Sequence, residues 1–243
     1  MLVEDIMTRK VISVSPGDAV IDALRLTREN RIRHLPVITR GDHEPAPGAG
    51  HKPVAPGPER PGADGEEQGR LVGIVSDRDL RDACPSILCP GDDDLLRRTP
   101  VGKIMHTRVV TAHPLDPIEE AARRLYEHRI GCLPVVRGEG LIGIVTETDL
   151  LRCLVELTGV LKPSTSLEVE VPDRPGMLAD VAGIVKRYGI NIISVLTTPG
   201  RSPDTKTLTL RVATIDPRRL ARDIEDAGHR VYLPLNLAET NRP

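Results

Sequence analysis

The sequence predicts an α+β protein in which a β-α-β-β-α unit occurs twice and is followed by a β-α-β-β-α-β unit. Two observations predict the duplication. Residues 3–16 align with residues 101–114 at a constant offset of 98 and share Val, Ile, Met, Val and Pro. The phrase Gly-Ile-Val-Ser/Thr-x-x-Asp-Leu occurs at 73–80 and again at 143–150. The third unit is predicted by a change of pattern after Pro163, where short alternating strands and two helices follow one another.

Each repeat is predicted to begin with a short strand that ends at a proline. An Asp N-cap, Asp18 or Asp116, then starts a helix whose apolar residues recur at i, i+3, i+4 and i+7. A strand around Leu-Pro-Val, a second strand that contains Gly-Ile-Val, and a closing helix complete the repeat. Because one such unit exposes an apolar sheet face, we expect the two copies to pack sheet against sheet. The expected short strands and Gly-Ile-Val strands are 11–14 and 71–75 in the first copy, and 109–112 and 141–145 in the second.

The two copies differ in length because the first contains a stretch rich in Gly and Pro. Residues 41–69 carry only one large apolar side chain, Val54, and cannot offset their ordering entropy by burial. We therefore expect a disordered surface loop there. A second Pro- and Asp-rich stretch, 84–100, is expected to be a solvated linker. The predicted organisation is 1–83 for the first unit, 84–100 for the linker, 101–157 for the second unit, 158–165 for a short linker, 166–235 for the third unit and 236–243 for a tail.

The third unit shows the order of a split β-α-β, ferredoxin-like fold. Its predicted first strand-to-helix turn is Asp173-Arg-Pro-Gly176, and Gly189 and Gly228 end its two helices. The expected strands are 166–171, 190–196, 207–213 and 230–235, with helices at 177–188 and from Asp216-Pro217 onward.

Composition excludes several classes of protein. The chain has no Phe or Trp, three Tyr, a net charge of −2 and a pI near 6.4, so it lacks the basic surface that nucleic acid requires. No apolar run reaches the length of a membrane span and the first residues do not form a signal peptide, so we expect a cytoplasmic protein without a membrane partner. The four Cys lack metal-site spacing, so we expect neither a metal nor a cofactor.

The repeated phrase has two interpretations. Ser76 and Asp79, like Thr146 and Asp149, fit a helix capping box with Asp in place of the usual Glu or Gln. The same groups also suit a small polar ligand, because the carboxylate can accept hydrogen bonds from two ribose hydroxyls while the hydroxyl residue and the helix-start N–H groups face ribose or phosphate. Both roles can coexist.

The side chains around the phrase differ between the copies. Arg33, His34 and Arg78 belong to the first copy, and Gly131, Cys132 and Thr148 stand at the matching places of the second. We therefore expect one phosphate-competent site in the first copy and a weaker companion in the second. The alternative for Arg33 and His34 is a solvated loop edge. The sequence Gly138-x-Gly140-x-x-Gly143 is expected to be a hairpin turn, since no helix opens at its glycines.

The duplicated unit resembles a pair of CBS domains, a Bateman module. The resemblance rests on Ile-Met-Thr near the start, on Arg31–Val37 (Arg-Ile-Arg-His-Leu-Pro-Val) with its counterpart Arg129–Val135, and on the repeated phrase. The final 80 or so residues resemble an ACT domain through their strand order, Asp-Arg-Pro-Gly and Gly189-Ile-Asn-Ile. The order of the domains also resembles that of the bacterial acetoin-utilisation family.

These resemblances imply a non-catalytic regulatory protein that senses an adenine nucleotide (AMP, ADP or ATP) in the CBS cleft. The nucleotide-site residues implied are Ser76, Asp79, Arg78, Arg33, His34, Thr146 and Asp149. In the ACT segment Asp173, Gly176 and Asn191 match an amino-acid-binding turn, although a structural turn at a dimer edge is the favoured interpretation. A homodimer is expected because the exposed edges of the ACT sheet usually need pairing or cover, and an unidentified protein target is a possible partner. The alternatives are a partner-binding module with an empty cleft, or a sensor of S-adenosylmethionine or NAD; an enzyme is disfavoured because no nucleophile or metal motif is found.

Overall fold

The computed structural model describes residues 1–39, 69–83 and 93–233. The chain divides into two compact units, Met1–Leu150 and Leu151–Pro243. The predicted disordered loop lies outside the described residues except for Gly69, as do residues 84–92 of the predicted linker and the tail from 234 onward. The boundary between the units falls inside the helix that closes the second repeat.

The first unit contains the two predicted repeats. The first repeat consists of α1 (Val3–Ile6), α2 (Val20–Glu29), β1 (His34–Thr39), β2 (Arg70–Ser76) and α3 (Asp77–Asp82). The second consists of α4 (Asp93–Arg98), η1 (Val101–Lys103), α5 (Ile118–His128), β3 (Cys132–Arg137), β4 (Gly140–Thr146) and α6 (Glu147–Thr158). The predicted strands 11–14 and 109–112 are reduced to single parallel bridges, Val14 to Val37 and Ala112 to Val135.

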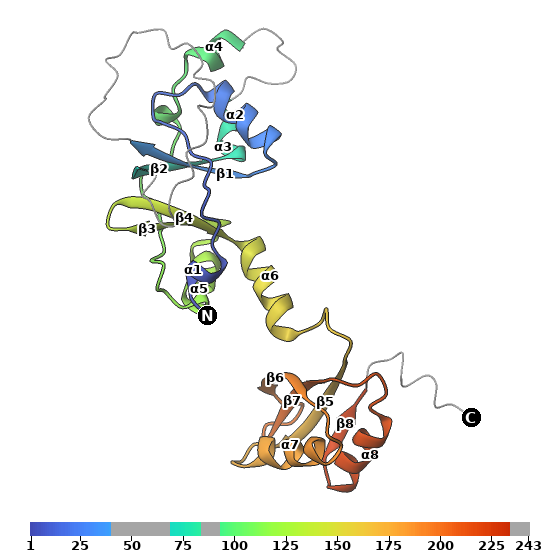
Figure 1. Cartoon of the computed structure of the whole chain (residues 1–243). Helices are drawn as coiled ribbons and strands as arrows, with labels where there is room; N and C mark the ends of the chain where they lie inside the picture. The colour runs from blue at the N-terminus through green and yellow to red at the C-terminus, as the bar shows by residue number, and fades with distance from the viewer. Residues whose placement is uncertain (40–68, 84–92, 234–243) are drawn as a thin grey trace. The chain divides into compact units, whose positions relative to one another are not determined.

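The two hairpins of this unit share one hydrogen-bonded sheet. β1 pairs with β2, and β3 with β4, in the same register and with a bulge at the same place. One pair, Arg70 with Gly140, joins the inner strands, so that the order is β1-β2-β4-β3 (Figure 1). The α+β class is confirmed. The two copies were expected to pack sheet against sheet; the structure instead joins them edge to edge in one sheet, because backbone groups of β2 and β4 pair across the inner edges.

Each repeat packs against the segment that precedes the other repeat in the chain. These segments, residues 2–8 and 100–106, are called the first and second lead-ins. Near the N-terminus, Leu2 pairs with Pro117 and Thr8 with Ile144, so the first lead-in lies against the second repeat. Val3 is fully buried in the core of that second repeat. The second lead-in lies against the first repeat in the same way: Ala19 pairs with Pro100, Ile74 with His106, and Val101 is buried in the first core. Each core is therefore built from both halves of the duplication.

The Asp residues expected as N-caps close the preceding turns instead. Oδ2 of Asp18 accepts the backbone N–H of Ser15 at 2.8 Å, and Oδ2 of Asp116 accepts that of His113 at 2.9 Å. The N-cap positions are Ala19 and Pro117, neither of which makes a side-chain cap. The prediction was wrong because an Asp beside a Pro-containing turn can satisfy an N–H behind it in the chain as easily as one ahead of it.

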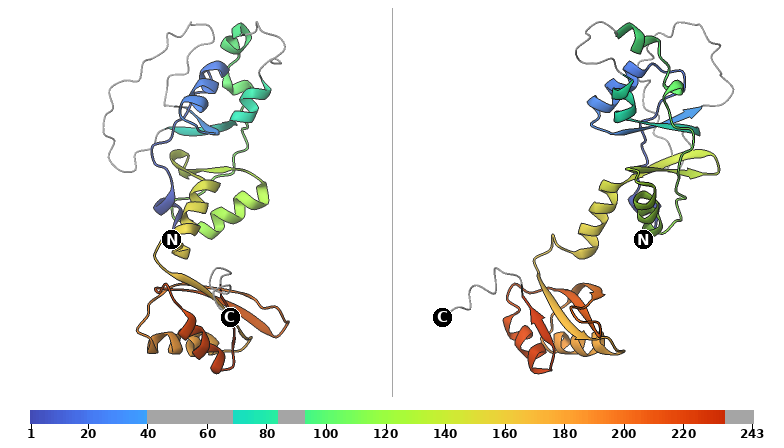
Figure 2. Two further views of the ribbon diagram at one scale, coloured as in Figure 1. Left: turned by 90° about the vertical axis from the view of Figure 1, so that its right-hand side faces the viewer. Right: turned by 180° about the vertical axis from the view of Figure 1, so that it is seen from behind.

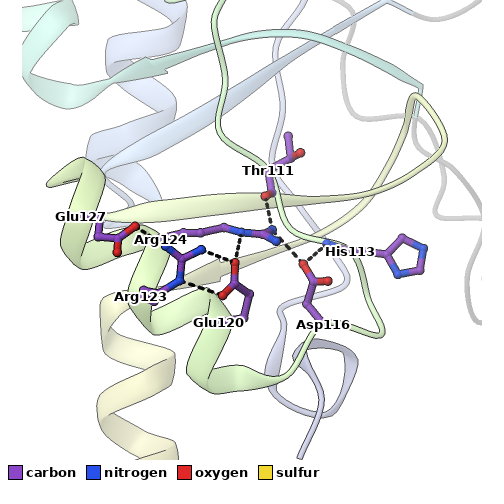
Figure 3. Close-up of polar contacts among 7 residues, drawn as sticks. All are labelled: Thr111, His113, Asp116, Glu120, Arg123, Arg124 and Glu127. Carbon is purple, nitrogen blue, oxygen red and sulfur yellow. Dashed lines mark hydrogen bonds and ion pairs between the residues drawn. The ribbon is translucent and has the colours of Figure 1, made fainter.

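A cluster of ion pairs fastens α5 in the second repeat (Figure 3). The Arg124 guanidinium donates to Asp116 at 2.8 Å, to Glu120 at 2.9 Å and to the Thr111 carbonyl at 2.9 Å. Arg123 donates to the two oxygens of Glu120 and also to Glu127. Arg124 thus connects the helix to the turn before it and to the backbone at Thr111, which precedes the Ala112 bridge.

The second half of the predicted solvated linker is ordered against the first repeat. Residues 93–98 form α4, and Leu96 is buried in the first core. The Thr99 carbonyl accepts the backbone N–H of Val20 at 2.9 Å. The prediction was based on the acidic residues and prolines of this stretch and overlooked Leu96, whose burial against the existing core is enough to hold one short helix there.

The second unit has the predicted ferredoxin-like topology. Its strands are β5 (Thr165–Pro172), β6 (Ile192–Pro199), β7 (Thr205–Val212) and β8 (Arg230–Tyr232), and its helices are α7 (Met177–Arg187) and α8 (Arg218–Asp226). All pairings are antiparallel in the order β6-β7-β5-β8. Both helices cover one face of the sheet, where their apolar residues join those of β5 and β7 in one core (Figure 2).

Candidate functional site

The repeated phrase forms a hydrogen-bonded box at both strand-to-helix junctions. At the first, Oδ2 of Asp79 accepts the Ser76 backbone N–H at 2.8 Å and the Ser76 hydroxyl at 2.7 Å, while the Asp79 N–H donates to Ser76 Oγ at 3.2 Å. At the second, Thr146 and Asp149 repeat these contacts at 2.9, 2.7 and 3.3 Å. The capping role predicted for the phrase is therefore confirmed in both copies.

The two carboxylate oxygens of Asp79 have different surroundings. Oδ2 makes both cap bonds, whereas Oδ1 lies 3.3 Å from Nε2 of His106. Burial alone would raise the pKa of Asp79, but the Ser76 hydrogen bonds and His106 outweigh it and lower that pKa below its ordinary value. Asp79 is thus an ionised acceptor with one oxygen committed to the helix and the other directed at a side chain that solvent can reach.

His106 was not among the residues predicted from sequence. It belongs to the lead-in of the second repeat and reaches Asp79 because the lead-ins are exchanged. The backbones of Ile74 and His106 hydrogen-bond reciprocally at 2.9 and 2.8 Å, as those of Ile144 and Thr8 do at 2.9 and 3.0 Å. His106 and Thr8 are therefore equivalent positions beside the two phrases, and the offset of 98 already aligned them. The signal was present, but nothing in the sequence indicated which phrase each would approach.

The glycine that opens each phrase makes room for a lead-in methionine. A Cβ built on Gly73 would lie 2.6 Å from the sulfur of Met105 and 3.1 Å from the His106 carbonyl oxygen. At Gly143 the same atoms belong to Met7 and Thr8, at 2.6 and 3.2 Å. The close approach of the backbones at these bridges requires glycine, and it places the residue after each methionine beside the phrase.

His34 lies at the contact between the two repeats. A Cβ added to Gly131 would lie 2.9 Å from Cε1 of the His34 ring and 3.7 Å from a carboxylate oxygen of Glu147. Burial and Arg33 lower the pKa of His34, against the opposing effect of Asp77, Glu147 and Asp79. The small residue at position 131 has a packing reason, since His34 of the other repeat occupies the space that a side chain would need.

The remaining basic residues of the predicted first site lie on the surface around the junction. Arg33 is exposed, and its carbonyl accepts the backbone N–H of Asp77 at 2.8 Å, so it adjoins the start of α3. Arg78 is exposed in the first turn of α3, as Thr148 is in that of α6. Asp77 pairs with Arg81 at 2.7 Å. Residues from three segments therefore meet at the first junction: the end of β2 with α3, the residue before β1, and the lead-in at His106.

The second junction is more enclosed. Asp149 is buried, whereas Asp79 is partly exposed. Beside it, burial raises the pKa of the Cys132 thiol to about 12, so that residue acts as a packing group. A surface hollow of about 530 Å³, lined by Leu125, Tyr126, Glu127, Arg129 and Glu147, opens on the α5 side of the second junction.

The three residues predicted for an amino-acid effector are not brought together within one chain. Asp173 follows β5 and pairs with Lys206 at 2.8 Å, and Gly176 begins α7 with a φ of 97°. Asn191 precedes β6, whose first residue pairs with Val212, while the other end of β7 pairs with Pro172. Asn191 and Asp173 are thus at opposite ends of the sheet, separated by roughly 20–25 Å at about 3.4 Å per residue.

Among the described residues, no helix combines the length and apolar character needed to cross a membrane. Across the same described segments, no three His, Cys, Asp or Glu side chains lie close enough together to bind a metal ion.

Comparison with protein families identifies both parts of the chain. A CBS-domain family model matches residues 3–48 and 101–156, and an ACT-domain model matches residues 165–229. The chain therefore carries a pair of CBS domains followed by an ACT domain. Both resemblances drawn from the sequence are confirmed. The first CBS match stops inside the Gly/Pro-rich stretch, and the structure supplies the missing hairpin partner, β2, on the far side of it.

Several curated proteins and solved structures are similar to this CBS–ACT protein. A CBS domain-containing protein of Dictyostelium discoideum is 28% identical over 170 residues, which cover 68% of this chain and 99% of the relative. YhcV of Bacillus subtilis is 28% identical over 148 residues, 61% of this chain and 81% of the relative. A Vibrio cholerae structure assigned to acetoin utilisation (AcuB) is 29% identical and covers 66% of this chain and 95% of its own, with a TM-score of 0.47. CBSX2, solved in complex with AMP, is 27% identical over 64% of this chain and 96% of its own, with a TM-score of 0.45.

Proposed function

We propose that the CBS–ACT protein is a non-catalytic regulator that binds an adenine nucleotide at the Asp79 junction. One observation carries the proposal. The Asp79 carboxylate is ionised, and its two oxygens have different partners: Oδ2 accepts the hydrogen bonds of the Ser76 cap, whereas Oδ1 faces the exposed side chain of His106. An ionised carboxylate oxygen that is not needed for the helix is a suitable acceptor for the adjacent hydroxyls of a ribose.

The surroundings favour a ligand that carries phosphate as well as ribose. Arg33, Arg78 and His106 all lie at this junction, and a guanidinium group is well suited to bind phosphate oxygens. The second junction offers the neutral side chains of Thr148 and Thr8 at the places equivalent to Arg78 and His106. This difference, together with the burial of Asp149, supports one dominant binding event per chain rather than two equal ones.

Calorimetric titration of the full chain with adenosine, AMP, ADP, ATP, NAD and S-adenosylmethionine tests the proposal. The informative variant is Asp79→Asn, because an amide keeps one oxygen for the cap while it replaces the Oδ1 acceptor with a donor. We expect a loss of at least roughly tenfold in affinity, the effect of about 1.4 kcal/mol. The matched control Asp149→Asn changes the same atoms in the second copy and should leave the dominant event in place.

Two results would contradict the proposal. Unchanged affinity in Asp79→Asn would remove Asp79 from the site, and two equally strong events in the wild-type chain would remove the distinction between the copies. A true ligand must also raise the melting temperature of the protein, since it binds the folded state alone. A complete panel without any thermal shift would favour the alternative of a partner-binding module with an empty cleft.

We further propose that ligand occupancy is communicated to the ACT domain through α6. This helix begins at Glu147, whose carboxylate acts electrostatically on His34 beside the first junction. Its last residue, Thr158, accepts a hydrogen bond from the Ser194 hydroxyl of β6 at 2.9 Å. Gly159 follows in the left-handed conformation, against Ile193. Hydrogen exchange of β6 should therefore decrease when nucleotide binds to the wild-type chain, and it should not respond in Asp79→Asn. A β6 that never responds to a bound ligand would refute the coupling while leaving the binding site intact.

A homodimer is proposed from the ACT sheet. β6, a strand of eight residues, lies at one edge of that sheet and carries the exposed side chain of Leu196. Unpaired edges of this length are normally covered or paired. Within one chain Asn191 and the Asp173 turn lie at opposite ends of this sheet, so a site that used both would need a second copy. Sedimentation velocity of the full chain decides the mass, and a monomer at micromolar concentration would refute the dimer.

The acetoin or carbon-metabolism role expected from the domain order also remains a proposal. Growth of a deletion strain of the source organism on acetoin, compared with growth on glucose, tests it; equal growth of mutant and parent on both carbon sources would contradict it.

A further inference from the structure

We propose that His106 sets the phosphate preference of the first CBS site, and that Thr8 at the equivalent place makes the second site indifferent to phosphate. This inference rests on the proposed nucleotide site and deepens it by naming the residue that selects the ligand.

The first support is that the two carboxylate oxygens of Asp79 have different hydrogen-bond partners. Oδ2 already accepts two hydrogen bonds from Ser76, at 2.8 and 2.7 Å, so a ligand hydroxyl must use Oδ1. His106 lies 3.3 Å from Oδ1, and its side chain is 67% exposed. A hydroxyl arriving from solvent therefore meets the imidazole and the carboxylate oxygen together. When the hydroxyl takes Oδ1, Nε2 of His106 is left with a donor directed into the same space.

The second support is the symmetry of the exchanged lead-ins. His106 is held by reciprocal backbone hydrogen bonds to Ile74, two residues before Ser76, and Thr8 is held by the same bonds to Ile144, two residues before Thr146. The backbone geometry at the two junctions is thus equivalent. The two lead-ins share the methionine that precedes these positions, Met105 and Met7, and differ at the residue that lies beside the phrase.

The chemistry of the two side chains predicts the difference in ligand. An imidazole can donate to a phosphate oxygen and can carry a positive charge, whereas a threonine hydroxyl is neutral and short. A nucleoside offers only ribose hydroxyls and a base, which both junctions can accept through their Asp. A nucleoside phosphate adds an anion that His106 can bind and Thr8 cannot. The first site should therefore discriminate AMP from adenosine, and the second should not.

The test exchanges the two residues in the full chain. His106→Thr gives the first junction the residue of the second, and we expect the affinity for AMP to fall roughly ten- to a hundredfold, the effect of one charge-assisted hydrogen bond. The affinity for adenosine should change less than about threefold. His106→Gln keeps a neutral donor and should fall between the two. Thr8→His, combined with Asp79→Asn to silence the first site, should increase the ratio of AMP to adenosine affinity at the second.

The ratio of AMP to adenosine affinity is the decisive readout, because a variant that merely loosens the fold would weaken both ligands together. His128→Thr, at an exposed position in the last turn of α5, serves as the matched control and should leave the ratio unchanged. A wild-type chain that binds AMP while His106→Thr keeps the same ratio would overturn this inference and leave the proposed function standing. A wild-type chain that binds neither AMP nor adenosine would refute both.

Discussion

Replacing Gly73 by Ala tests whether this position is a glycine because the second lead-in packs against it. The new Cβ would lie 2.6 Å from the Met105 sulfur and 3.1 Å from the His106 carbonyl oxygen. The sulfur is the flexible part of a long side chain and can move aside. The carbonyl cannot, because it accepts the Ile74 N–H at 2.9 Å and any retreat weakens that bridge.

The magnitude follows from two opposing effects. Overpacking at a tight backbone contact costs roughly 1–3 kcal/mol, while the lower conformational entropy of an unfolded chain with Ala returns about 0.4–1 kcal/mol. We therefore expect a net loss of about 1–2 kcal/mol in the free energy of unfolding of the first unit. By calorimetry this corresponds to a drop of roughly 2–8 °C in the melting transition of that unit.

A double-mutant cycle identifies the cause. In a Met105→Ala background the sulfur is absent, so Gly73→Ala should cost measurably less than it does in the wild-type chain. Gly17→Ala is the matched control, because a Cβ there meets nothing within 4 Å. Equal costs of Gly73→Ala in both backgrounds, or a Gly17→Ala cost as large as that of Gly73→Ala, would show that the lead-in contact is not the reason for the glycine.

Arg124→Leu gives α5 the residue that stands at the matching position of the first repeat, Leu26, and removes the donors to Asp116, Glu120 and Thr111. We expect the free energy of unfolding, measured in urea, to fall by about 1–3 kcal/mol. The exposed control Arg28→Leu should change it by less than about 0.5 kcal/mol, and equal losses in the two variants would contradict the role of the cluster. Arg123 and Arg124 lower the pKa of Glu120 from its ordinary 4.5 to about 2. The ionised carboxylate therefore adds stability that is fully present above pH 4.5 and is lost as the pH falls toward 2. In Arg123→Met the melting temperature should fall less across that pH range than in the wild-type chain, and an equal fall would refute the assignment. Gly183→Ala, in the exposed interior of α7 with no atom within 4 Å of the new Cβ, should stabilise the ACT domain by about 0.5–1 kcal/mol, and a lower melting temperature would reveal a contact that the structure does not show.

Local chemistry made much of this fold predictable. The order of elements in both repeats and in the ACT domain follows from apolar periodicity and from the Gly and Pro that end each element. The capping boxes at Ser76 and Thr146 are local by nature, since all their bonds lie within three residues. The predictions that failed involve choices between nearby partners, as at Asp18 and Asp116, or the burial of a single side chain such as Leu96.

The exchange of the lead-ins could not be predicted for a different reason. Residues 3–8 and 101–106, which are the exchanged parts of the lead-ins, share Val, Ile and Met at the same spacing, so their apolar pattern does not indicate which repeat each one joins. Periodicity cannot distinguish two nearly identical partners, and only the connectivity of the folded chain decides between them. His106 was missed as a consequence, because within its own repeat it would have had no reason to approach Asp79.

The exchange also determines which differences between the repeats concern a ligand. Arg33 and Gly131 were expected to separate a phosphate site from a neutral one, yet Gly131 is small because the His34 ring of the other repeat fills the space beside it. That difference has a packing explanation and therefore carries little information on the second site. His106 and Thr8 differ under no such constraint, since their backbones are held by equivalent bridges and the His106 side chain is exposed. Where the backbone geometry is the same and packing leaves the side chain free, a difference between the copies can reflect ligand binding. For this reason the pair His106 and Thr8, rather than the pair Arg33 and Gly131, is the one that we use to distinguish the two candidate sites.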